Sequence, residues 1–358
     1  MTDGGSAGDR ILRVRAVLAA SRRLVDACDP LGREARELLP AATGLSARGV
    51  ELGLSRHLET AASDDDLARL VARAGAAPRV HVVLSANIFV GAVRAIACAV
   101  AASPSVRVRP SSREAVMAPL LVRALAGTAM GDVTLCDALV PRAGDGVHVY
   151  GRDETIAAIA SESPAGVRIV GHGPGFGVAL VDATSDVTGV AERLSWDVVA
   201  FDQRGCLSPR VALFRGSPGE AEAFAERLDA ELAEREREVP LGGLSADERS
   251  ERALYRDTAS ALGRCFVRAT STVGLDLTPR ALVLPPPGRN IHVARIHDSG
   301  DIGNLVEPYG PAITCVGHES ENALAPSVLA FVRGARSLPI GAMQCPPLDG
   351  PVDLRVML

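Results

Sequence analysis

The chain has 358 residues, of which 47% are hydrophobic and 23% charged, and its formal net charge is −5. All 38 residues counted as Lys or Arg are arginines, which excludes both a P-loop lysine and a lysine Schiff base. The arginines are scattered and aromatic residues make up only 3%, so nucleic-acid binding is disfavoured. At roughly 150 residues per domain, the length predicts about two domains.

Membrane and metal sites are also disfavoured. No run of about 18 apolar residues occurs, so no membrane span is predicted. The polar, glycine-rich residues 1–9 are not followed by an apolar signal segment. The seven cysteines are dispersed without a CxxC pair, so no metal site is assigned. We expect a cytoplasmic protein with free thiols, and the sequence leaves its oligomeric state open.

The first half of the chain predicts helices and then a repeating unit. Apolar residues at helical spacing extend from about Arg10 to Leu39, and Pro40 is expected to end that helix. A second helix contains Leu67 and Leu70. Three apolar runs are then each followed by a polar loop and a helical segment. The runs are 80–84, 106–109 and 147–150, with helices at 91–100, at 113–125 and after 155.

The second half continues this alternation of strand and helix. Its expected elements are strands at 167–170, 178–181 and 211–214, helices at 187–194, 218–238 and 247–262, and a final edge strand at 352–356. For the long helix, Ser217 is the expected cap and Pro240 the expected end. Strands alternating with helices predict an α/β fold with parallel sheets and helices on both faces.

Cys206 lies in a polar loop between a helical segment and a strand. A thiol in such a loop can be partly exposed, and Arg204 with the loop amides would favour the thiolate. Taken alone, a loop cysteine is more often inert than catalytic. Asn87 similarly follows a strand, where an asparagine commonly caps a turn or helix.

Four segments that occur in a fixed order favour a catalytic role for Cys206. They are Ser85-Ala-Asn87, Val106-Arg-Val-Arg-Pro-Ser-Ser112, the loop of Cys206, and Glu307-Pro-Tyr-Gly-Pro311. Together they resemble the aldehyde dehydrogenase superfamily. Within it, the segment Phe201-Asp-Gln-Arg-Gly-Cys-Leu-Ser-Pro209 and the tail Met343-Gln-Cys-Pro-Pro-Leu-Asp349 are most similar to LuxC-like acyl-CoA reductases.

The resemblance implies roles for individual residues. Cys206 would be the nucleophile, with Asn87 and the backbone N–H of Cys206 as oxyanion donors. Arg109 replaces a lysine that contacts the adenosine ribose, and its planar fork suits a 2′-phosphate, which favours NADPH. Glu307 would bind the nicotinamide ribose. The implied cofactor-binding residues are Ser85, Arg109, Pro110, Ser111, Gly151, Arg152 and Glu307.

The glycine-rich segment 171–177 carries no acidic residue. Hydrolytic relatives have a general-base glutamate in this region, and the matching positions here are Gly171 and His172. The absence of this glutamate favours thioester reduction over hydrolysis, and it equally fits a homologue without activity. His172 is either a proton donor to the aldehyde oxygen or a structural turn histidine.

The resemblance also implies a division of the chain. We expect N-terminal helices and an NADP-binding domain at 1–172, a catalytic domain with Cys206 at 173–335, and a tail at 336–358 that returns to the body of the protein. Each of the first two would be a Rossmann-like, aldehyde-dehydrogenase-like α/β domain.

The expected activity is NADPH-dependent reduction of an acyl thioester to an aldehyde through an acyl-cysteine intermediate. The substrate would be a fatty acyl-CoA or an acyl-carrier thioester. One alternative is an acyl-phosphate reductase of the glutamyl-phosphate type, which segment 149–155 also fits. Another is a non-catalytic homologue that docks an acyl-activating protein partner.

Overall fold

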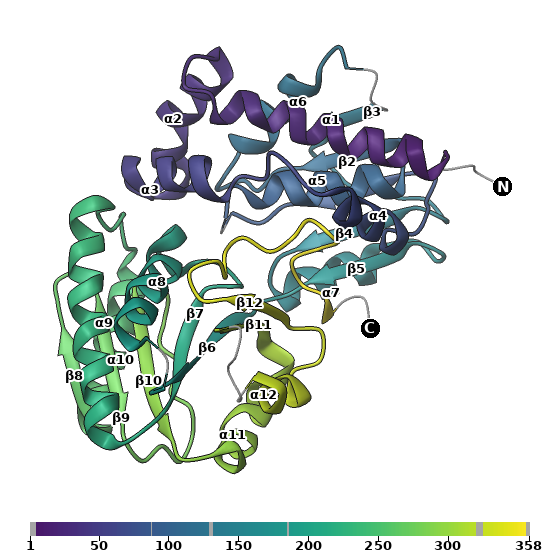
Figure 1. The fold of residues 1–358 in the computed structure, drawn as a ribbon. Helices are drawn as coiled ribbons and strands as arrows, with labels where there is room; N and C mark the ends of the chain where they lie inside the picture. Colours follow the sequence, from purple (N-terminus) through teal and green to yellow (C-terminus); the bar gives the residue numbers. More distant parts are fainter. Residues whose placement is uncertain (1–4, 87, 129–131, 185, 320–324, 356–358) are drawn as a thin grey trace. The chain divides into compact units, whose positions relative to one another are not determined.

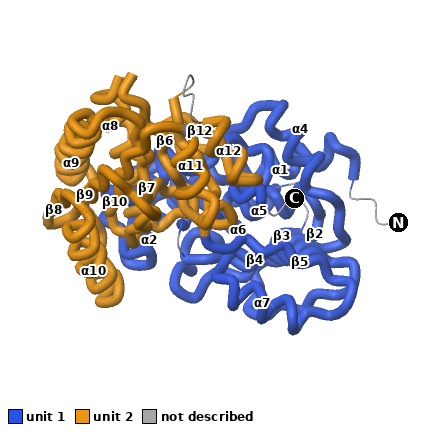
Figure 2. The backbone as a smooth tube through the Cα atoms, turned by 90° about the horizontal axis from the view of Figure 1, so that it is seen from below, with its two compact units in different colours: residues 1–174, 347–358 blue, residues 175–346 orange. Residues whose placement is uncertain are grey.

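The computed structural model describes residues 5–86, 88–128, 132–184, 186–319 and 325–355 (Figure 1). The chain divides into two compact units (Figure 2). Unit 1 comprises residues 1–174 and 347–358, and unit 2 comprises residues 175–346. Each unit is built around its own β-sheet with helices on both faces, as the predicted α/β class requires.

Unit 1 contains a five-stranded parallel sheet with the order β3-β2-β1-β4-β5. Its strands are β1 (Val80–Val83), β2 (Ser105–Arg109), β3 (Asp132–Leu135), β4 (Gly146–Tyr150) and β5 (Arg168–His172). The chain builds outward from β1 to β3 and then returns to the other side of β1. This reversal creates a switch point between β1 and β4, where loops at the carboxyl ends of strands commonly form a ligand site.

Helices cover both faces of this sheet. They are α1 (Ala7–Val25), α2 (Pro30–Thr43), α3 (Ala47–Leu52), α4 (Asp64–Arg73), α5 (Gly91–Ala102), α6 (Met117–Leu125) and α7 (Asp153–Glu162). Figure 1 shows α1 lying along α5 and α6, and these helices contact one another. On the opposite face, Ile156 and Ile159 of α7 pack with Val147 and Val149 of β4.

Unit 2 contains a seven-stranded sheet with the order β12-β11-β6-β7-β10-β9-β8. The strands are β6 (Phe176–Asp182), β7 (Pro209–Arg215), β8 (Arg264–Val267), β9 (Thr272–Asp276), β10 (Asn290–Ile296), β11 (Ile313–His318) and β12 (Arg336–Pro339). They are parallel except for β8, which pairs antiparallel with β9 at one edge. The central strands are buried on both faces, which explains their continuous apolar runs.

The helices of unit 2 also lie on two faces. They are α8 (Val187–Val199), α9 (Pro218–Glu238), α10 (Ala246–Leu262), α11 (Ser299–Val306) and α12 (Ala325–Phe331). Phe224 of α9 stacks on Phe214 of β7, with ring centroids 5.2 Å apart. On the opposite face, Leu213 of β7 belongs to a core with residues of α11 and α12.

Several predicted boundaries are corrected. The predicted helix 10–39 is two helices, because Asp29 caps α2 and Pro30 occupies its first position. Pro40 does not end α2, which continues to a left-handed cap at Gly44 (φ 73°). The helix expected from 113 begins at Met117, because the buried Glu114 carboxylate accepts the N–H groups of 116 and 117 at 2.9 and 2.8 Å.

The C-terminal segment also differs from the prediction. Residues 336–339 form β12 within unit 2, whereas 347–355 group with unit 1. Arg94 of α5, only 2% exposed, donates to the carbonyls of Pro347 and Gly350 at 2.9 and 3.0 Å. The predicted edge strand at 352–356 is wrong for its described residues. The Asp353 carboxylate accepts the Arg355 N–H at 3.0 Å, and this local turn replaces strand pairing.

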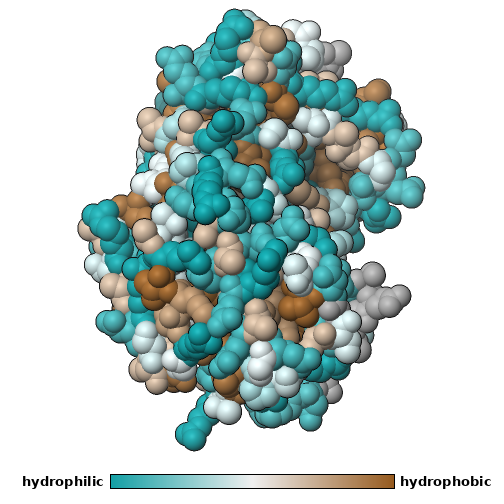
Figure 3. Space-filling view, turned by 60° about the vertical axis from the view of Figure 1, so that its left-hand side comes forward, coloured by the Kyte–Doolittle hydropathy of each residue, from teal (hydrophilic) through white to brown (hydrophobic). Residues whose placement is uncertain are grey.

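The surface drawn in Figure 3 intersperses hydrophilic and hydrophobic side chains. Among the helices of the described residues, none combines the length and the apolar content that crossing a membrane requires. All seven cysteines are free thiols, as expected from their dispersion.

Candidate active site

Most of the predicted cofactor residues lie at the carboxyl edge of the sheet in unit 1. Ser85 follows β1, Arg109 ends β2, and Gly151 follows β4. Two backbone hydrogen bonds fix these strand ends. Leu84 N–H donates to the Arg109 carbonyl at 3.0 Å, and Gly151 N–H donates to the His172 carbonyl at 3.2 Å. The structure therefore brings the loops after β1, β2 and β4 to one edge, around the switch point.

This edge carries cations that are free to meet an anion. Among the described residues, the guanidinium groups of Arg109 and Arg152 have no ion pair or hydrogen bond. Pro110 and Ser111 continue from Arg109 in a half-buried loop. The amino terminus of α7 begins after Arg152 without a side-chain cap; the Arg152 carbonyl accepts the Thr155 N–H at 3.0 Å, and Asp153 and Glu154 lie in the first turn. These features fit the phosphates of a dinucleotide.

Asn87, the predicted oxyanion donor, lies outside the described residues. Its neighbour Ser85 is half-buried beyond the end of β1.

His172 ends β5 in unit 1 and is 6% exposed. Its ring stacks on Tyr150, with centroids 4.1 Å apart and planes 8° from parallel. Its Nε2 lies 3.3 Å from Nδ1 of His148, and burial lowers the pKa of His172 to about 3. The imidazole is therefore neutral at physiological pH, and its predicted role as a proton donor stays a prediction.

Cys206 lies at the amino edge of the sheet in unit 2, three residues before β7 begins. It is half-buried, and its backbone carbonyl accepts a hydrogen bond from the hydroxyl of Thr314 on β11. Ser208 N–H donates to Gly205 O at 3.1 Å, closing a turn around the cysteine. The thiol is thus carried on a short loop whose backbone is fixed on both sides.

An unusual backbone conformation precedes this loop. Phe201, Asp202 and Gln203 have φ angles of 54°, 50° and 61° in succession. None is glycine, and each left-handed residue of this kind costs about 1–2 kcal/mol. The chain leaves α8 through this left-handed turn and reaches Cys206 three residues later.

Gly177 on β6 allows a close approach to the same loop. Its N–H donates to Ser208 O at 2.8 Å. A Cβ at this position would lie 2.4 Å from the Leu207 carbonyl oxygen and 2.8 Å from Cε of Met343. Only glycine leaves room for both contacts, so β6, the cysteine loop and Met343 are packed tightly together.

Two buried groups lie near this packing. The carboxylate of Asp197 accepts the N–H of Gly341 at 2.5 Å and of Met343 at 3.0 Å, which holds the segment around Met343. Burial raises the pKa of Asp197 to about 7. Burial also raises the pKa of Cys315 well above its usual value, and Asp197 and Cys206 add to that shift. Cys315 is therefore a protonated neighbour of the Cys206 thiol.

Glu307 is exposed on a 3₁₀ turn (Glu307–Ala312) that leads into β11. No described residue pairs with its carboxylate. Two residues on, Tyr309 packs edge-to-face on Phe176 at the start of β6, with centroids 6.3 Å apart. Because β6, β7 and β11 are parallel neighbours, Glu307 and Cys206 lie at the same edge of this sheet.

Sequence reasoning missed three residues that build the cysteine loop. They are Thr314, which donates to the Cys206 carbonyl, and the ion pair of Asp202 with Arg289, whose side chain is fully buried. Thr314 lies 108 residues from Cys206 along the chain, and Arg289 lies 87 residues from Asp202. No local pattern signals pairings over such distances.

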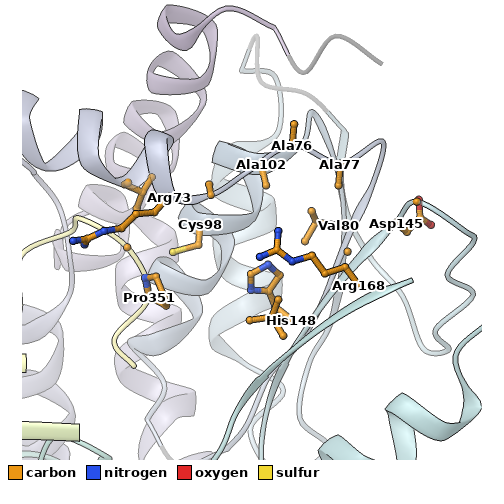
Figure 4. Close-up of a pocket in the computed structure, with 16 residues that line it drawn as sticks. Arg73, Ala76, Ala77, Val80, Cys98, Ala102, Asp145, His148, Arg168 and Pro351 are labelled. Atoms are coloured by element: carbon orange, nitrogen blue, oxygen red, sulfur yellow. The ribbon is translucent and has the colours of Figure 1, made fainter. Parts of the chain in front are cut away.

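Unit 1 also contains a cavity of about 80 Å³ (Figure 4). It lies at the amino ends of β1, β4 and β5, opposite the edge that carries Ser85 and Arg109. Figure 4 shows Cys98 of α5, His148 of β4 and Arg168 of β5 around it. None of the predicted site residues lines this cavity. Within the described ranges, no three His, Cys, Asp or Glu side chains group closely enough to hold a metal ion.

A family model, acyl-CoA reductase (LuxC), matches residues 50–274. The matched range covers 63% of the chain and includes β1, the switch-point loops and Cys206. No curated protein matches the chain.

Solved structures share the fold across nearly the whole chain. An oxidoreductase from Marinobacter aquaeolei has 12% identity and a TM-score of 0.72, covering 100% of this chain and 85% of that one. A NAD-dependent benzaldehyde dehydrogenase from Corynebacterium glutamicum has 15% identity and a TM-score of 0.70, covering 94% and 80%. Aldehyde dehydrogenase 21 from Physcomitrella patens has 13% identity and a TM-score of 0.68, covering 96% and 79%. At these identities the likeness establishes the aldehyde dehydrogenase fold.

Proposed function

Because this chain belongs to the LuxC family of acyl-CoA reductases and is an oxidoreductase with the aldehyde dehydrogenase fold, we propose that it reduces an acyl thioester to an aldehyde with NADPH. The observation that carries the proposal is the placement of Cys206. It is a half-buried free thiol on a loop that long-range hydrogen bonds hold in place, within the range matched by the family model.

The first step is acyl transfer to the enzyme. The Cys206 thiolate attacks the thioester carbonyl, a new carbon–sulfur bond forms, and the thiol of the carrier leaves with its electron pair and takes up a proton. The backbone N–H of Cys206 and the side-chain amide of Asn87 are the proposed oxyanion donors. One such donor is typically worth about 2.7–4 kcal/mol to the transition state.

The second step is reduction of the acyl-cysteine. When bound, NADPH supplies the hydride that takes the acyl carbon to the aldehyde oxidation level. Collapse of the resulting tetrahedral oxyanion breaks the carbon–sulfur bond, releases the aldehyde and restores the Cys206 thiolate. Segment 171–177 has no carboxylate that could activate water, which protects the acyl-enzyme from hydrolysis.

Charged groups that are free to bind support the cofactor assignment. Arg109 and Arg152 would meet phosphates, and the Glu307 carboxylate would accept hydrogen bonds from the two nicotinamide ribose hydroxyls. The planar fork of Arg109 suits a 2′-phosphate, and this is the basis for proposing NADPH over NADH.

The test is a steady-state assay that offers the enzyme acyl-CoA and acyl phosphate separately. We expect loss of nicotinamide absorbance with NADPH and acyl-CoA, with one aldehyde trapped for each cofactor consumed. Turnover with acyl phosphate alone would favour the acyl-phosphate reductase instead. Absence of turnover with both substrates, in protein that binds NADPH, would refute the proposal.

A further inference from the structure

The left-handed turn before Cys206 is held by a buried ion pair. Arg289, 1% exposed, donates from Nε and Nη2 to Oδ1 of Asp202 at 3.0 and 2.7 Å. The other carboxylate oxygen of Asp202 accepts the Gly242 N–H at 3.0 Å, and its carbonyl accepts the Gly288 N–H at 2.9 Å. Asp202 is thus bound through both its side chain and its backbone while its φ is 50°.

The remaining arm of Arg289 reaches a second element. Its Nη1 donates to Oε2 of Glu236 and to the carbonyl of Val239, both at 2.7 Å. Both acceptors lie at the end of α9, and Arg289 itself immediately precedes β10. One guanidinium therefore ties α9 and β10 to the turn that leads to Cys206. Its fixed planar geometry suits this three-way connection.

Gln203 holds the turn from the other side. Its side chain is fully buried, and its Nε2 donates to the carbonyls of Pro209 at 2.8 Å and Asn290 at 2.9 Å. Its Oε1 accepts the Asn290 N–H at 2.7 Å. The amide therefore bridges the starts of β7 and β10, and each of its polar atoms has a partner.

We propose that Asp202, Gln203 and Arg289 form a positioning clamp that sets the place of the Cys206 thiol for attack on the acyl carbonyl. Two residues separate Gln203 from Cys206, and Arg204 N–H donates back to Phe201 O at 3.1 Å. A shift of the turn is thus transmitted directly to the cysteine. This inference rests on the proposed function, in which Cys206 is the nucleophile.

The clamp explains why three non-glycine residues stand in left-handed conformation here. A relaxed loop would satisfy folding at lower strain but would leave the thiol without a fixed position. Misplacing a reacting atom by about 1 Å can lower a rate by about 100-fold. The three side chains act through the loop backbone and are positioning residues, not catalytic ones.

A paired substitution separates positioning from folding. Arg289→Met removes the cation that is hydrogen-bonded to the buried Asp202 carboxylate and leaves it only the more distant Arg204, with Nη1 and Oδ2 3.9 Å apart, so this single variant is expected to lose stability. Arg289→Met with Asp202→Gly removes that carboxylate and places at 202 a residue that accepts positive φ without strain. The double variant is therefore expected to recover part of the melting temperature, while the Glu236 and Val239 acceptors still lack the Arg289 donor.

The readout is the single-turnover rate of carrier-thiol release from an acyl-CoA, which reports acylation of Cys206. We expect the double variant to acylate at least about 100-fold more slowly than wild type, with its NADPH Kd within about twofold. Gln203→Met should slow acylation in the same way. Arg268→Met, which breaks the ion pair with Asp229 (2.8 and 2.5 Å) elsewhere in unit 2, is the matched control and should acylate at the wild-type rate.

The outcomes are distinct. Acylation that recovers together with stability in the double variant would assign the clamp to folding alone and overturn the inference. A wild type that releases no carrier thiol would overturn the proposed function, and the clamp inference with it. Slow acylation in a stable double variant supports both.

Discussion

The carboxyl edge of the sheet in unit 1 and the amino edge of the sheet in unit 2 are built in opposite ways. At the first, loops follow directly from β1, β2 and β4, and the guanidinium groups of Arg109 and Arg152 have no partner among the described residues. At the second, the loop of Cys206 is held by a buried ion pair, a buried amide and the hydroxyl of Thr314.

This difference corresponds to two tasks. A dinucleotide must bind and leave in each cycle, so cations that hold it need to be free of competing carboxylates. A nucleophile must be placed against the carbonyl with little freedom, so its backbone needs many fixed contacts. Substitutions at the first edge should therefore change cofactor affinity, whereas those at the second should change turnover and stability.

The largest expected effect is at the nucleophile itself. Cys206→Ala should lower kcat for NADPH-dependent aldehyde formation by about 10⁴-fold or more, because the proposed acyl-enzyme forms on this thiol. Cys28→Ala removes an exposed thiol between α1 and α2 and is the control. Equal loss of activity in both variants, or substantial activity in Cys206→Ala, would contradict the role of Cys206.

Gly177→Ala should have the next largest effect. The new Cβ would meet the Leu207 carbonyl oxygen at 2.4 Å, so the cysteine loop or β6 must shift. We expect kcat to fall by about 10- to 100-fold and stability by about 1–3 kcal/mol, measured by kinetics and by denaturant unfolding. Gly219→Ala on α9, where a Cβ meets nothing within 4 Å, is the control and should leave both unchanged or raise stability slightly.

At the carboxyl edge of the sheet in unit 1 the expected effect is smaller and concerns cofactor affinity rather than turnover. Arg109→Ala should raise KM for NADPH by about 10-fold with little change in KM for NADH, because a phosphate contact of about 1.4 kcal/mol is lost. The kcat should stay within about twofold. Arg113→Ala, an exposed arginine four residues further on, is the matched control. An equal rise in KM for NADPH and for NADH would show that Arg109 does not contact the 2′-phosphate.

The smallest effect concerns acid stability. Burial lowers the pKa of His172 to about 3 and that of His148 to about 4, below the usual histidine value of about 6.5. In mild acid the unfolded chain therefore binds more protons than the folded chain does. The free energy of unfolding is then highest above about pH 6.5, and these two histidines lower it as the pH falls toward 3–4. His172→Phe should reduce the loss of unfolding free energy between pH 7 and pH 5 by about 2 kcal/mol, because this range holds about 1.5 pH units below the unfolded pKa at about 1.4 kcal/mol each.

An unchanged acid response in His172→Phe would contradict the buried, neutral state of this imidazole. The same variant tests the proton-donor role predicted from the sequence, which requires kcat to fall by about 100-fold.

The sequence predicted the strands that carry the cofactor residues because their signals are local. The β-branched runs 80–84 and 106–109 and the loops that follow them appear where expected, at one edge of a parallel sheet. Helix α9 begins at Pro218 with Ser217 as its cap, as its sequence predicts. Such features depend on neighbours within a few residues, so the local order of residue types identifies them.

The parts that could not be predicted depend on distant partners. The polar loop signal at Cys206 was correct, but nothing near it in sequence indicated a left-handed turn held by Arg289. Arg289 follows three prolines and a glycine, a context that predicts an exposed loop, yet its side chain is 1% exposed. Burial of an ion pair is decided by tertiary packing, which overrides the local pattern.

The most direct test of the account is the acyl adduct on Cys206. The protein is incubated with a fatty acyl-CoA without NADPH, and its mass is measured intact and after proteolysis. We predict a gain equal to one acyl group on the peptide that contains Cys206, lost as aldehyde when NADPH is added and absent in Cys206→Ala. No mass gain in protein that binds the acyl-CoA, or an adduct that persists in Cys206→Ala, would contradict the central claim.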